Sequence, residues 1–141
     1  PEDIKAAIQM KKENFNTVVN CVTKINDIEE MKSKSVPKMV YDDNNNLLYA
    51  SRSSIPGSKE GVILGYKQVC IYCFNSKELE LFADNSKSPN EKVEDIEILR
   101  LLDKGVGVKL LILDSSSVAV DYPKDVEKVE NILNNGEKNE F

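Results

Sequence analysis

The sequence contains no histidine, and this absence excludes several kinds of active site. Serine–histidine triads, zinc sites with histidine ligands and imidazole proton shuttles all need that side chain. Carboxylates, lysine, arginine, tyrosine and hydroxyls remain available for chemistry. The cysteines number three, and an odd count does not suggest a disulfide framework.

Glycine is scarce and unevenly placed, since none of the six glycines precedes Gly57. A glycine-rich loop followed by a basic residue, which would hold phosphates through backbone N–H groups, therefore cannot be drawn near the start. The chain also lacks an apolar run of about 20 residues and an opening signal segment. We therefore expect no membrane span and a cytoplasmic location.

Positive charge is in deficit, because 24 acidic residues outnumber 19 basic ones and give a net charge of −5. This balance argues against general binding to nucleic acid or to an anionic membrane. The length of 141 residues and the hydrophobic content of 40% are typical of one globular domain. We expect an α/β domain over residues 1–136 and a frayed tail over 137–141.

Hydrophobic periodicity predicts a mixed order of helices and strands. The expected helices cover residues 1–14, 27–32, 76–83, 90–103 and 123–133. The expected strands cover 17–23, 66–74, 107–114 and 118–120, and a β-hairpin joins 37–42 to 47–51 through a polar turn. The strand at 17–23 is apolar and β-branched throughout, which indicates burial on both faces.

Several side chains receive a predicted direction from this pattern. Ser76 is expected to cap the helix over 76–83, with Leu79 pointing inward. The helix over 90–103 is expected to bury one apolar stripe and to place its acidic residues on the opposite side. The stripe consists of Val93, Ile96, Leu99 and Leu102, and the opposite side carries Glu91, Glu94, Asp95 and Lys104. The last helix is expected to bury Val126, Val129, Ile132 and Leu133.

Cys70 and Cys73 have the C-x-x-C spacing of some redox and zinc sites. They lie in a run that is typical of a strand, where residues three apart point to opposite faces. A metal shared by these two thiols is therefore not expected.

Two segments place a charged residue where a strand ends. Arg52 stands among hydroxyls before Ile55-Pro56, a dipeptide that favours extended backbone, and its guanidinium suits an anion. Asp121 follows a short apolar run and precedes Pro123, which can open a helix. From the residues alone, a surface ion pair for Arg52 and a contact with the helix start for Asp121 remain open alternatives.

These segments read LYASRSSIP over residues 48–56 and AVDYPKDVE over 119–127. They resemble those of nucleotide-sugar cytidylyltransferases, most closely the CMP-Kdo synthetases (3-deoxy-manno-octulosonate cytidylyltransferases). GYKQVCIYCF over 65–74 and EDIEILR over 94–100 also resemble a strand and a helix of that family. The four blocks occur in the same order, and the resemblance covers residues 1 to about 134.

The resemblance implies an α/β nucleotide-diphospho-sugar transferase fold with a mixed sheet, three layers and a β-hairpin insertion that contributes to a homodimer. It implies CTP-dependent activation of a 3-deoxy-2-keto sugar acid for surface-polysaccharide synthesis, with pyrophosphate release. The family's N-terminal triphosphate loop has no counterpart here, so we interpret the chain as the C-terminal portion of such an enzyme, inactive by itself.

The resemblance also implies roles for individual residues. Asp121 would be the Mg²⁺ ligand, since this ion prefers hard oxygen ligands. Arg52 would bind the sugar carboxylate. Four further residues would contact the substrate: Gln68, Tyr72, Glu94 and Glu97. Glu94 and Glu97 could instead form only a solvated helix face.

The sequence departs from the family at two positions that the family uses around the sugar. Gln68 replaces a histidine, and Ile98 replaces a glutamine. Gln68 keeps a hydrogen-bonding tip but carries no charge. A different acidic substrate, such as sialic acid or a phosphonate, and a non-catalytic assembly or regulatory module therefore remain alternatives.

Overall fold

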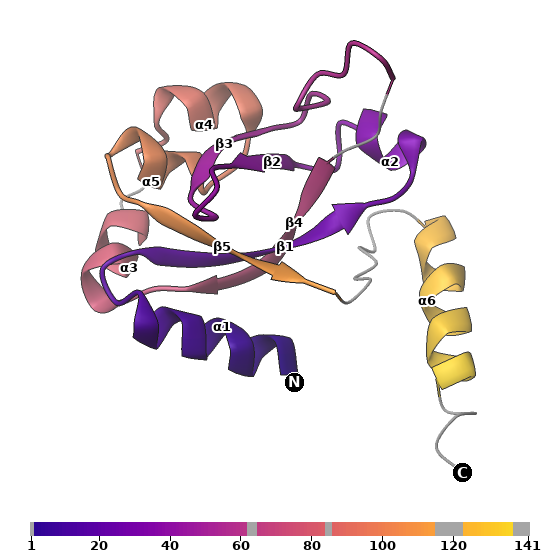
Figure 1. Ribbon diagram of the computed structural model, residues 1–141, viewed down its shortest axis with the longest axis horizontal. Coiled ribbons are helices and arrows are strands. Elements are labelled where there is room, and N and C mark those ends of the chain that lie inside the picture. The colour runs from indigo at the N-terminus through magenta and orange to yellow at the C-terminus, as the bar shows by residue number, and fades with distance from the viewer. Residues whose placement is uncertain (1, 62–64, 84–85, 115–122, 137–141) are drawn as a thin grey trace.

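The computed structural model describes residues 2–61, 65–83, 86–114 and 123–136 (Figure 1). In chain order the elements are α1 (Glu2–Glu13), β1 (Val18–Ile25), α2 (Ile28–Lys32), β2 (Lys38–Tyr41), β3 (Leu47–Ser51), β4 (Gly65–Cys73), α3 (Ser76–Ala83), α4 (Pro89–Glu94), α5 (Leu99–Asp103), β5 (Val108–Leu113) and α6 (Pro123–Gly136).

The strands form one mixed sheet in the order β3-β2-β4-β1-β5. β1 and β5 are parallel, whereas the other pairs are antiparallel. β2 and β3 form the predicted hairpin, which extends the sheet beside β4. All residues of β1 except Lys24 are buried, which confirms the prediction of burial on both faces.

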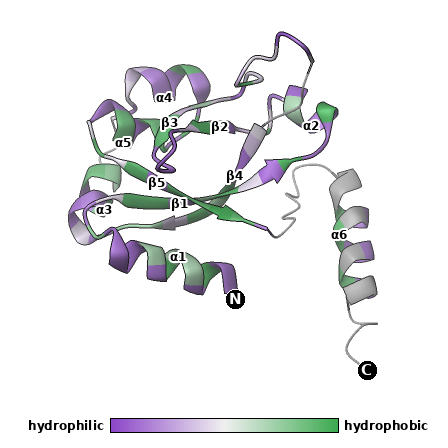
Figure 2. Ribbon diagram, in the orientation of Figure 1, coloured by the Kyte–Doolittle hydropathy of each residue, from purple (hydrophilic) through white to green (hydrophobic). Residues whose placement is uncertain are grey.

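Helices lie against both faces of the sheet, so the described chain has the predicted three layers (Figure 1). On one face, Ala7 of α1 packs with Val19, Cys21 and Leu113. On the other face, the segment that leads into α5 packs on β1, β2, β3 and β5 in the larger core. Figure 2 shows the apolar colouring concentrated on β1 and β5, between these layers.

The pairing of β4 with β1 contains a bulge. Asn20 pairs with Tyr72 whereas Cys21 pairs with Val69, so two residues of β4 have no partner on β1. The buried Asn20 amide donates to the carbonyls of Val69 (3.0 Å) and Ile71 (3.0 Å). This side chain thus satisfies two carbonyls of β4 at the bulge, where the regular ladder is interrupted.

The single helix predicted over 90–103 is wrong, because the structure has α4 and α5 separated by a turn. Asp95 has a left-handed backbone (φ 52°) and ends α4, and Ile96 and Ile98 then enter the core. The turn changes which side chains are buried. Val93 is 84% exposed although it was expected in the buried stripe, and Glu91, expected on the solvent side, is buried.

Helix α3 is also capped differently from the prediction. Asn75 accepts from the backbone N–H of Glu78 (2.9 Å), and the Glu78 carboxylate accepts from the Asn75 N–H (2.8 Å). This reciprocal pair is a capping box that starts one residue before Ser76. Leu79 is exposed, whereas the buried Glu78 points inward.

The Lys11 centre, which we define as Lys11, Glu78 and the carbonyls of Phe15 and Thr17, explains why Glu78 is buried. The Lys11 ammonium contacts the Glu78 carboxylate at 2.6 Å and both carbonyls at 2.8 Å. It joins α1 to the start of α3. A buried charge is tolerated when it is paired and hydrogen-bonded in this way.

The C-terminal helix α6 ends at Gly136, three residues beyond the predicted end. Val126 and Leu133 are exposed on it, contrary to the expected burial. The predicted strand over 118–120 and the tail over 137–141 lie outside the described residues. Within the ranges that the structure describes, the helices are all too short or too polar to span a membrane.

Candidate functional site

A cavity of about 270 Å³ brings together three of the predicted site residues, Arg52, Gln68 and Glu97. They come from the end of β3, from β4 and from the turn between α4 and α5. Loop 33–37, which connects α2 to β2, forms a further wall through Ser35, Val36 and Pro37. Residues distant in sequence therefore line one concave surface, as ligand sites commonly require.

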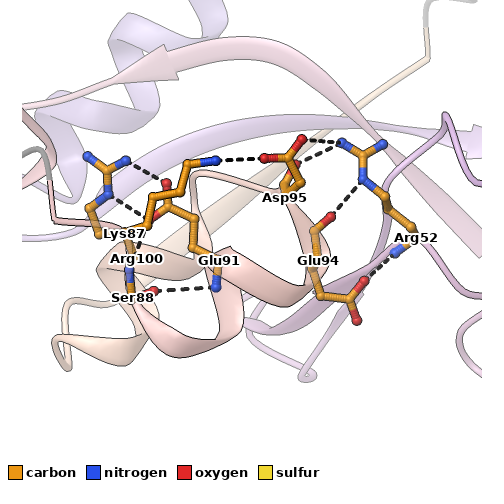
Figure 3. A network of polar contacts seen from close by, with 7 residues as sticks. All are labelled: Arg52, Lys87, Ser88, Glu91, Glu94, Asp95 and Arg100. Atoms are coloured by element: carbon orange, nitrogen blue, oxygen red, sulfur yellow. Dashed lines mark hydrogen bonds and ion pairs between the residues drawn. The ribbon is translucent and has the colours of Figure 1, made fainter.

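Arg52 is held by backbone carbonyls from two segments, the end of α4 and loop 33–37, and Figure 3 shows its contacts with Glu94 and Asp95. Its Nε donates to the Glu94 carbonyl and its Nη2 to the Asp95 carbonyl, each at 2.7 Å. Its Nη1 donates to the carbonyls of Lys34 (3.0 Å) and Ser35 (3.4 Å). Nη2 also lies 3.9 Å from the exposed Asp95 carboxylate, so the surface ion pair that the residues alone left open is present. The guanidinium thus joins the end of α4 to loop 33–37 at the cavity wall.

Glu94 supports Arg52 from the opposite direction. One carboxylate oxygen accepts from the Ser51 hydroxyl (2.7 Å) and the other accepts from the Arg52 backbone N–H (2.9 Å), as Figure 3 shows for Arg52. Both oxygens of Glu94 are therefore used inside the protein. The resemblance placed Glu94 at the substrate, and the geometry gives it a position behind Arg52.

Gln68 and Tyr72 lie on the same face of β4. The Gln68 amide donates to the Tyr72 hydroxyl (2.6 Å) and to the side-chain oxygen of Asn20 (3.2 Å). Burial, with smaller contributions from Cys70 and Glu97, raises the pKa of Tyr72 well above its ordinary value. A neutral phenol therefore accepts from Gln68 and fixes the amide at the cavity. Asn20 was missed at the sequence level, although a lone amide in an apolar strand was the available signal.

Glu97 is exposed and lines the cavity, so its carboxylate is accessible to a ligand. Its neighbour Ile98 is fully buried in the larger core. The position where the resembling family has glutamine therefore contributes hydrocarbon to the core here, and Gln68 supplies the amide that lines the cavity.

A second group that sequence reasoning missed is the Lys38 centre, which we define as Lys38, Arg52 and loop 33–37. Lys38 is fully buried. Its ammonium donates to the carbonyls of Ser33 (2.7 Å), Val36 (2.7 Å) and Arg52. Burial, followed by the charge of Arg52, lowers the pKa of Lys38, and the charge of Glu94 opposes this shift. The sequence shows Lys38 only as one more lysine beside a strand.

An ion pair fixes the helical side of the cavity (Figure 3). Arg100 of α5 binds the buried Glu91 carboxylate of α4, with Nε at 2.8 Å. Glu91 also completes a capping box with Ser88. The Arg100 hydrogen bond lowers the pKa of Glu91. This pair holds α4 against α5, and so places the Glu94 and Asp95 carbonyls that Arg52 binds.

Cys70 and Cys73 point to opposite sides of the sheet, as predicted. Cys70 is exposed and lines the cavity, whereas Cys73 packs with the cluster under α1. Asp121, the predicted metal ligand, lies outside the described residues. Within the ranges that the structure describes, no three acidic or cysteine side chains come together as a metal site.

A larger cavity of about 430 Å³ lies at the carboxyl ends of the parallel strands β1 and β5. Thr23, Asp27 and Asp114 line it. Glu30 and Lys67, which form an ion pair, line both this cavity and the smaller one. The two cavities therefore share a wall made of one acidic and one basic side chain.

Comparisons with known proteins agree with this architecture. The sequence model described as Cytidylyltransferase matches residues 1–113. The 3-deoxy-manno-octulosonate cytidylyltransferase of Chlamydia caviae is 33% identical over 129 residues, which cover 90% of this chain and 51% of that protein. The protein of the same name from Thermodesulfovibrio yellowstonii is 31% identical over 140 residues, covering 94% of this chain and 55% of that protein.

A solved structure of CMP:2-keto-3-deoxy-manno-octonic acid synthetase, complexed with CTP, is similar with a TM-score of 0.85 and 25% identity. The match covers 96% of this chain and 57% of that one. The likeness confirms the predicted fold class. The chain spans about half the length of the curated relatives it matches.

Proposed function

Because the chain belongs to the cytidylyltransferase family, we propose that the protein carrying it activates a 3-deoxy-2-keto sugar acid of the Kdo type with CTP. The observation that carries this proposal is the cavity in which Arg52, Gln68 and Glu97 meet. These three residues offer one positive charge, one amide and one accessible carboxylate, and the cavity is also lined by Asp95 and by the Glu30–Lys67 ion pair. A sugar acid presents a carboxylate and several hydroxyls, which these groups complement.

In the proposed reaction a sugar hydroxyl attacks the α-phosphate of CTP. The hydroxyl loses its proton to solvent as a bond forms between its oxygen and the α-phosphorus. The bond to the bridging oxygen breaks, and pyrophosphate leaves with the electron pair. The described residues would bind and orient the sugar. Glu97 would accept from hydroxyls, Gln68 would hydrogen-bond to a polar group of the sugar, and the positive charge of Arg52 would attract its carboxylate.

Glu94 and Tyr72 have supporting positions in this scheme. Glu94 uses both carboxylate oxygens to hold Ser51 and Arg52, and Tyr72 holds Gln68. Their contribution to binding would pass through the residues that they fix. We therefore expect their replacement to lower the affinity for the sugar acid indirectly, because the cavity loses its arrangement, and replacement of Glu94 to reduce stability as well.

The Mg²⁺ that the family resemblance implies does not fit the described residues by themselves. No three acidic or cysteine side chains gather as a metal site over 2–61, 65–83, 86–114 and 123–136. We keep Asp121 as the proposed ligand. Asp121→Asn tests this assignment. It should raise the Mg²⁺ concentration needed for half-maximal pyrophosphate release in the assay below, and an unchanged Mg²⁺ requirement would reject the assignment.

The test is release of pyrophosphate from CTP, Mg²⁺ and Kdo. It should be run with this chain and with the longest protein that its gene encodes. We expect release only from protein that also carries the half of the family's length not represented here. Glu97→Gln should raise the KM for Kdo about tenfold or more. Lys92→Gln replaces an exposed side chain of α4 that does not line the cavity, and as the control it should leave the KM unchanged. No release from the longer protein would overturn the proposal.

Cytidylyl transfer to another acidic substrate is the second candidate, and the burial of Ile98 favours it. The amide that the family places there is replaced by core hydrocarbon, and Gln68 replaces the family's histidine. Sialic acid and a phosphonate, offered in competition with Kdo, would rank the substrates. A non-catalytic assembly or regulatory module is the remaining alternative, and it predicts no release with any of them.

The resemblance also leads us to propose that the protein is a homodimer in the cytoplasm and that its product enters surface-polysaccharide synthesis. Sedimentation of the longer protein tests the first point. A monomer at the concentration of the assay would reject it.

A further inference from the structure

We propose that Lys38 is a positioning residue, whose buried ammonium fixes loop 33–37 and Arg52 as one wall of the smaller cavity. This inference rests on the proposed function only for the identity of the ligand. It concerns a side chain that does not line the cavity and that would act through the groups it holds.

The first support is the environment of the ammonium. A lysine ammonium has three donors and no acceptor. The three hydrogen bonds of Lys38 go to the carbonyls of Ser33, Val36 and Arg52. The side chain is fully buried, so water does not supply its partners. Three carbonyl oxygens converge on this point because a positive charge lies between them.

The second support is the distribution of acceptors along loop 33–37. The carbonyls of residues 33 and 36 bind Lys38, and those of residues 34 and 35 bind Arg52. The next carbonyl, that of Pro37, accepts from the Gln68 backbone N–H (3.1 Å). Five successive carbonyls thus accept from Lys38, Arg52 and Gln68. Of these three donors, Arg52 and Gln68 themselves line the cavity.

The third support is the direct link from Lys38 to Arg52. Lys38 binds the Arg52 carbonyl, and Glu94 binds the Arg52 N–H. Both backbone groups of Arg52 are therefore fixed by buried or half-buried charged side chains. Without the ammonium, three buried carbonyl oxygens would face one another without a donor, which is unfavourable. The loop would turn toward water and would remove the acceptors of the Arg52 guanidinium.

The chain contains only two arginines, Arg52 and Arg100, which makes this idea directly measurable. Each Nε–H is hydrogen-bonded, to the Glu94 carbonyl and to the Glu91 carboxylate respectively. In ¹⁵N-labelled protein, the exchange of each Nε–H with solvent can be followed by NMR. Arg100 serves as an internal control, because it lies outside the Lys38 centre.

Lys38→Met should accelerate exchange of the Arg52 Nε–H about tenfold or more and leave that of Arg100 unchanged. Lys11→Met combined with Glu78→Leu is the matched control, since it removes another buried lysine that binds carbonyls without leaving a buried charge, and it should leave Arg52 unchanged. Unchanged Arg52 exchange in folded Lys38→Met would overturn the proposal. Equal acceleration of Arg52 in both variants would do the same, because it would report general destabilisation.

Lys38→Ala provides a rescue experiment that remains decisive if Lys38→Met does not fold. The alanine leaves space for propylammonium, which matches the three carbons and the ammonium that the substitution removes. Propylammonium should restore slow Arg52 exchange, whereas propanol should not. If propylammonium neither folds this variant nor slows the exchange, the proposal is rejected.

The measurement needs neither CTP nor a sugar acid, so it separates this inference from the proposed function. A protected Arg52 signal that depends on Lys38, together with no pyrophosphate release, would retain the positioning role and reject the function. Release with an Arg52 signal that is indifferent to Lys38 would retain the function and reject the positioning role.

Discussion

The Lys11 centre and the Lys38 centre use the same kind of side chain in two different ways. Both lysines are buried, and both donate to backbone carbonyls. Lys11 also contacts a carboxylate, Glu78, at 2.6 Å. The hydrogen bonds of Lys38 instead go to carbonyls alone, and a second cation, Arg52, lies beside it.

The Lys11 centre is a structural connection between two helices, whereas the Lys38 centre lies beside a ligand cavity. At the Lys11 centre the positive and negative charges compensate each other, and the pair joins α1 to α3. At the Lys38 centre the ammonium donates only to carbonyl dipoles, and the nearby carboxylates, Glu94 and Asp95, contact Arg52 instead.

The largest effect is expected from breaking the Lys11 pair. Lys11→Met leaves the Glu78 carboxylate buried without its partner, which should reduce the free energy of unfolding by about 3 to 5 kcal/mol. Adding Glu78→Leu should recover much of this loss, because no buried charge then remains. Urea denaturation of the two single variants and the double variant measures the coupling. Additive losses would show that the pair is not the source of the effect.

Glu94 and Glu97, which lie near the Lys38 centre, should differ in their effect on stability. Glu94→Ala removes the acceptor of the Ser51 hydroxyl and of the Arg52 N–H, and should cost about 2 kcal/mol of stability. Glu97→Gln changes an exposed residue and should alter stability by less than about 0.5 kcal/mol. Thermal unfolding of both variants, beside the Kdo titration, checks the division. Equal stability losses would contradict it.

A smaller effect distinguishes the two candidates for the cap of α3, which borders the Lys11 centre. Asn75→Ala should cost about 1 kcal/mol because it removes half of the capping box with Glu78. Ser76→Ala should be neutral, since Asn75 already supplies the cap. The free energies of unfolding in urea should differ accordingly. A larger loss from Ser76→Ala would restore the original sequence-based assignment.

The smallest effect concerns pH. The folded-state pKa of Lys38 is lowered by burial and by Arg52, although Glu94 acts in the opposite sense. Between this lowered pKa and the ordinary lysine pKa of about 10.4, the unfolded state holds more protons, so stability from this group rises with pH. Lys38→Met should lack that rise. Urea midpoints of both proteins at several alkaline pH values measure it, and parallel curves would exclude the expected linkage.

The order of elements was predictable because each strand and helix carries its own periodicity. The buried β1, the hairpin and α1 follow directly from apolar spacing and from turn residues. The break between α4 and α5 was not predictable in this way, since Val93, Ile96 and Leu99 fit a continuous helix. Carbonyls at that break are bound by Arg52, a residue 42 positions earlier than Glu94, which local spacing cannot detect.

The site was predictable as a set of residues but not as a set of contacts. Resemblance identified Arg52, Gln68 and Glu97, which line one cavity. It did not distinguish Glu94, whose oxygens are used internally, from the exposed Glu97. Lys38 and Asn20 were missed because their importance depends on burial and on carbonyls brought close by the fold.

The bulge in β4 restricts how this strand can change in length. Two residues, Cys70 and Ile71, have no partner on β1, and an even number preserves alternation, so Gln68 and Tyr72 remain on one face. Removing both residues would shorten the strand and keep that shared orientation. Removing one would send the amide and the phenol to opposite sides of the sheet, so length variation here should occur in steps of two.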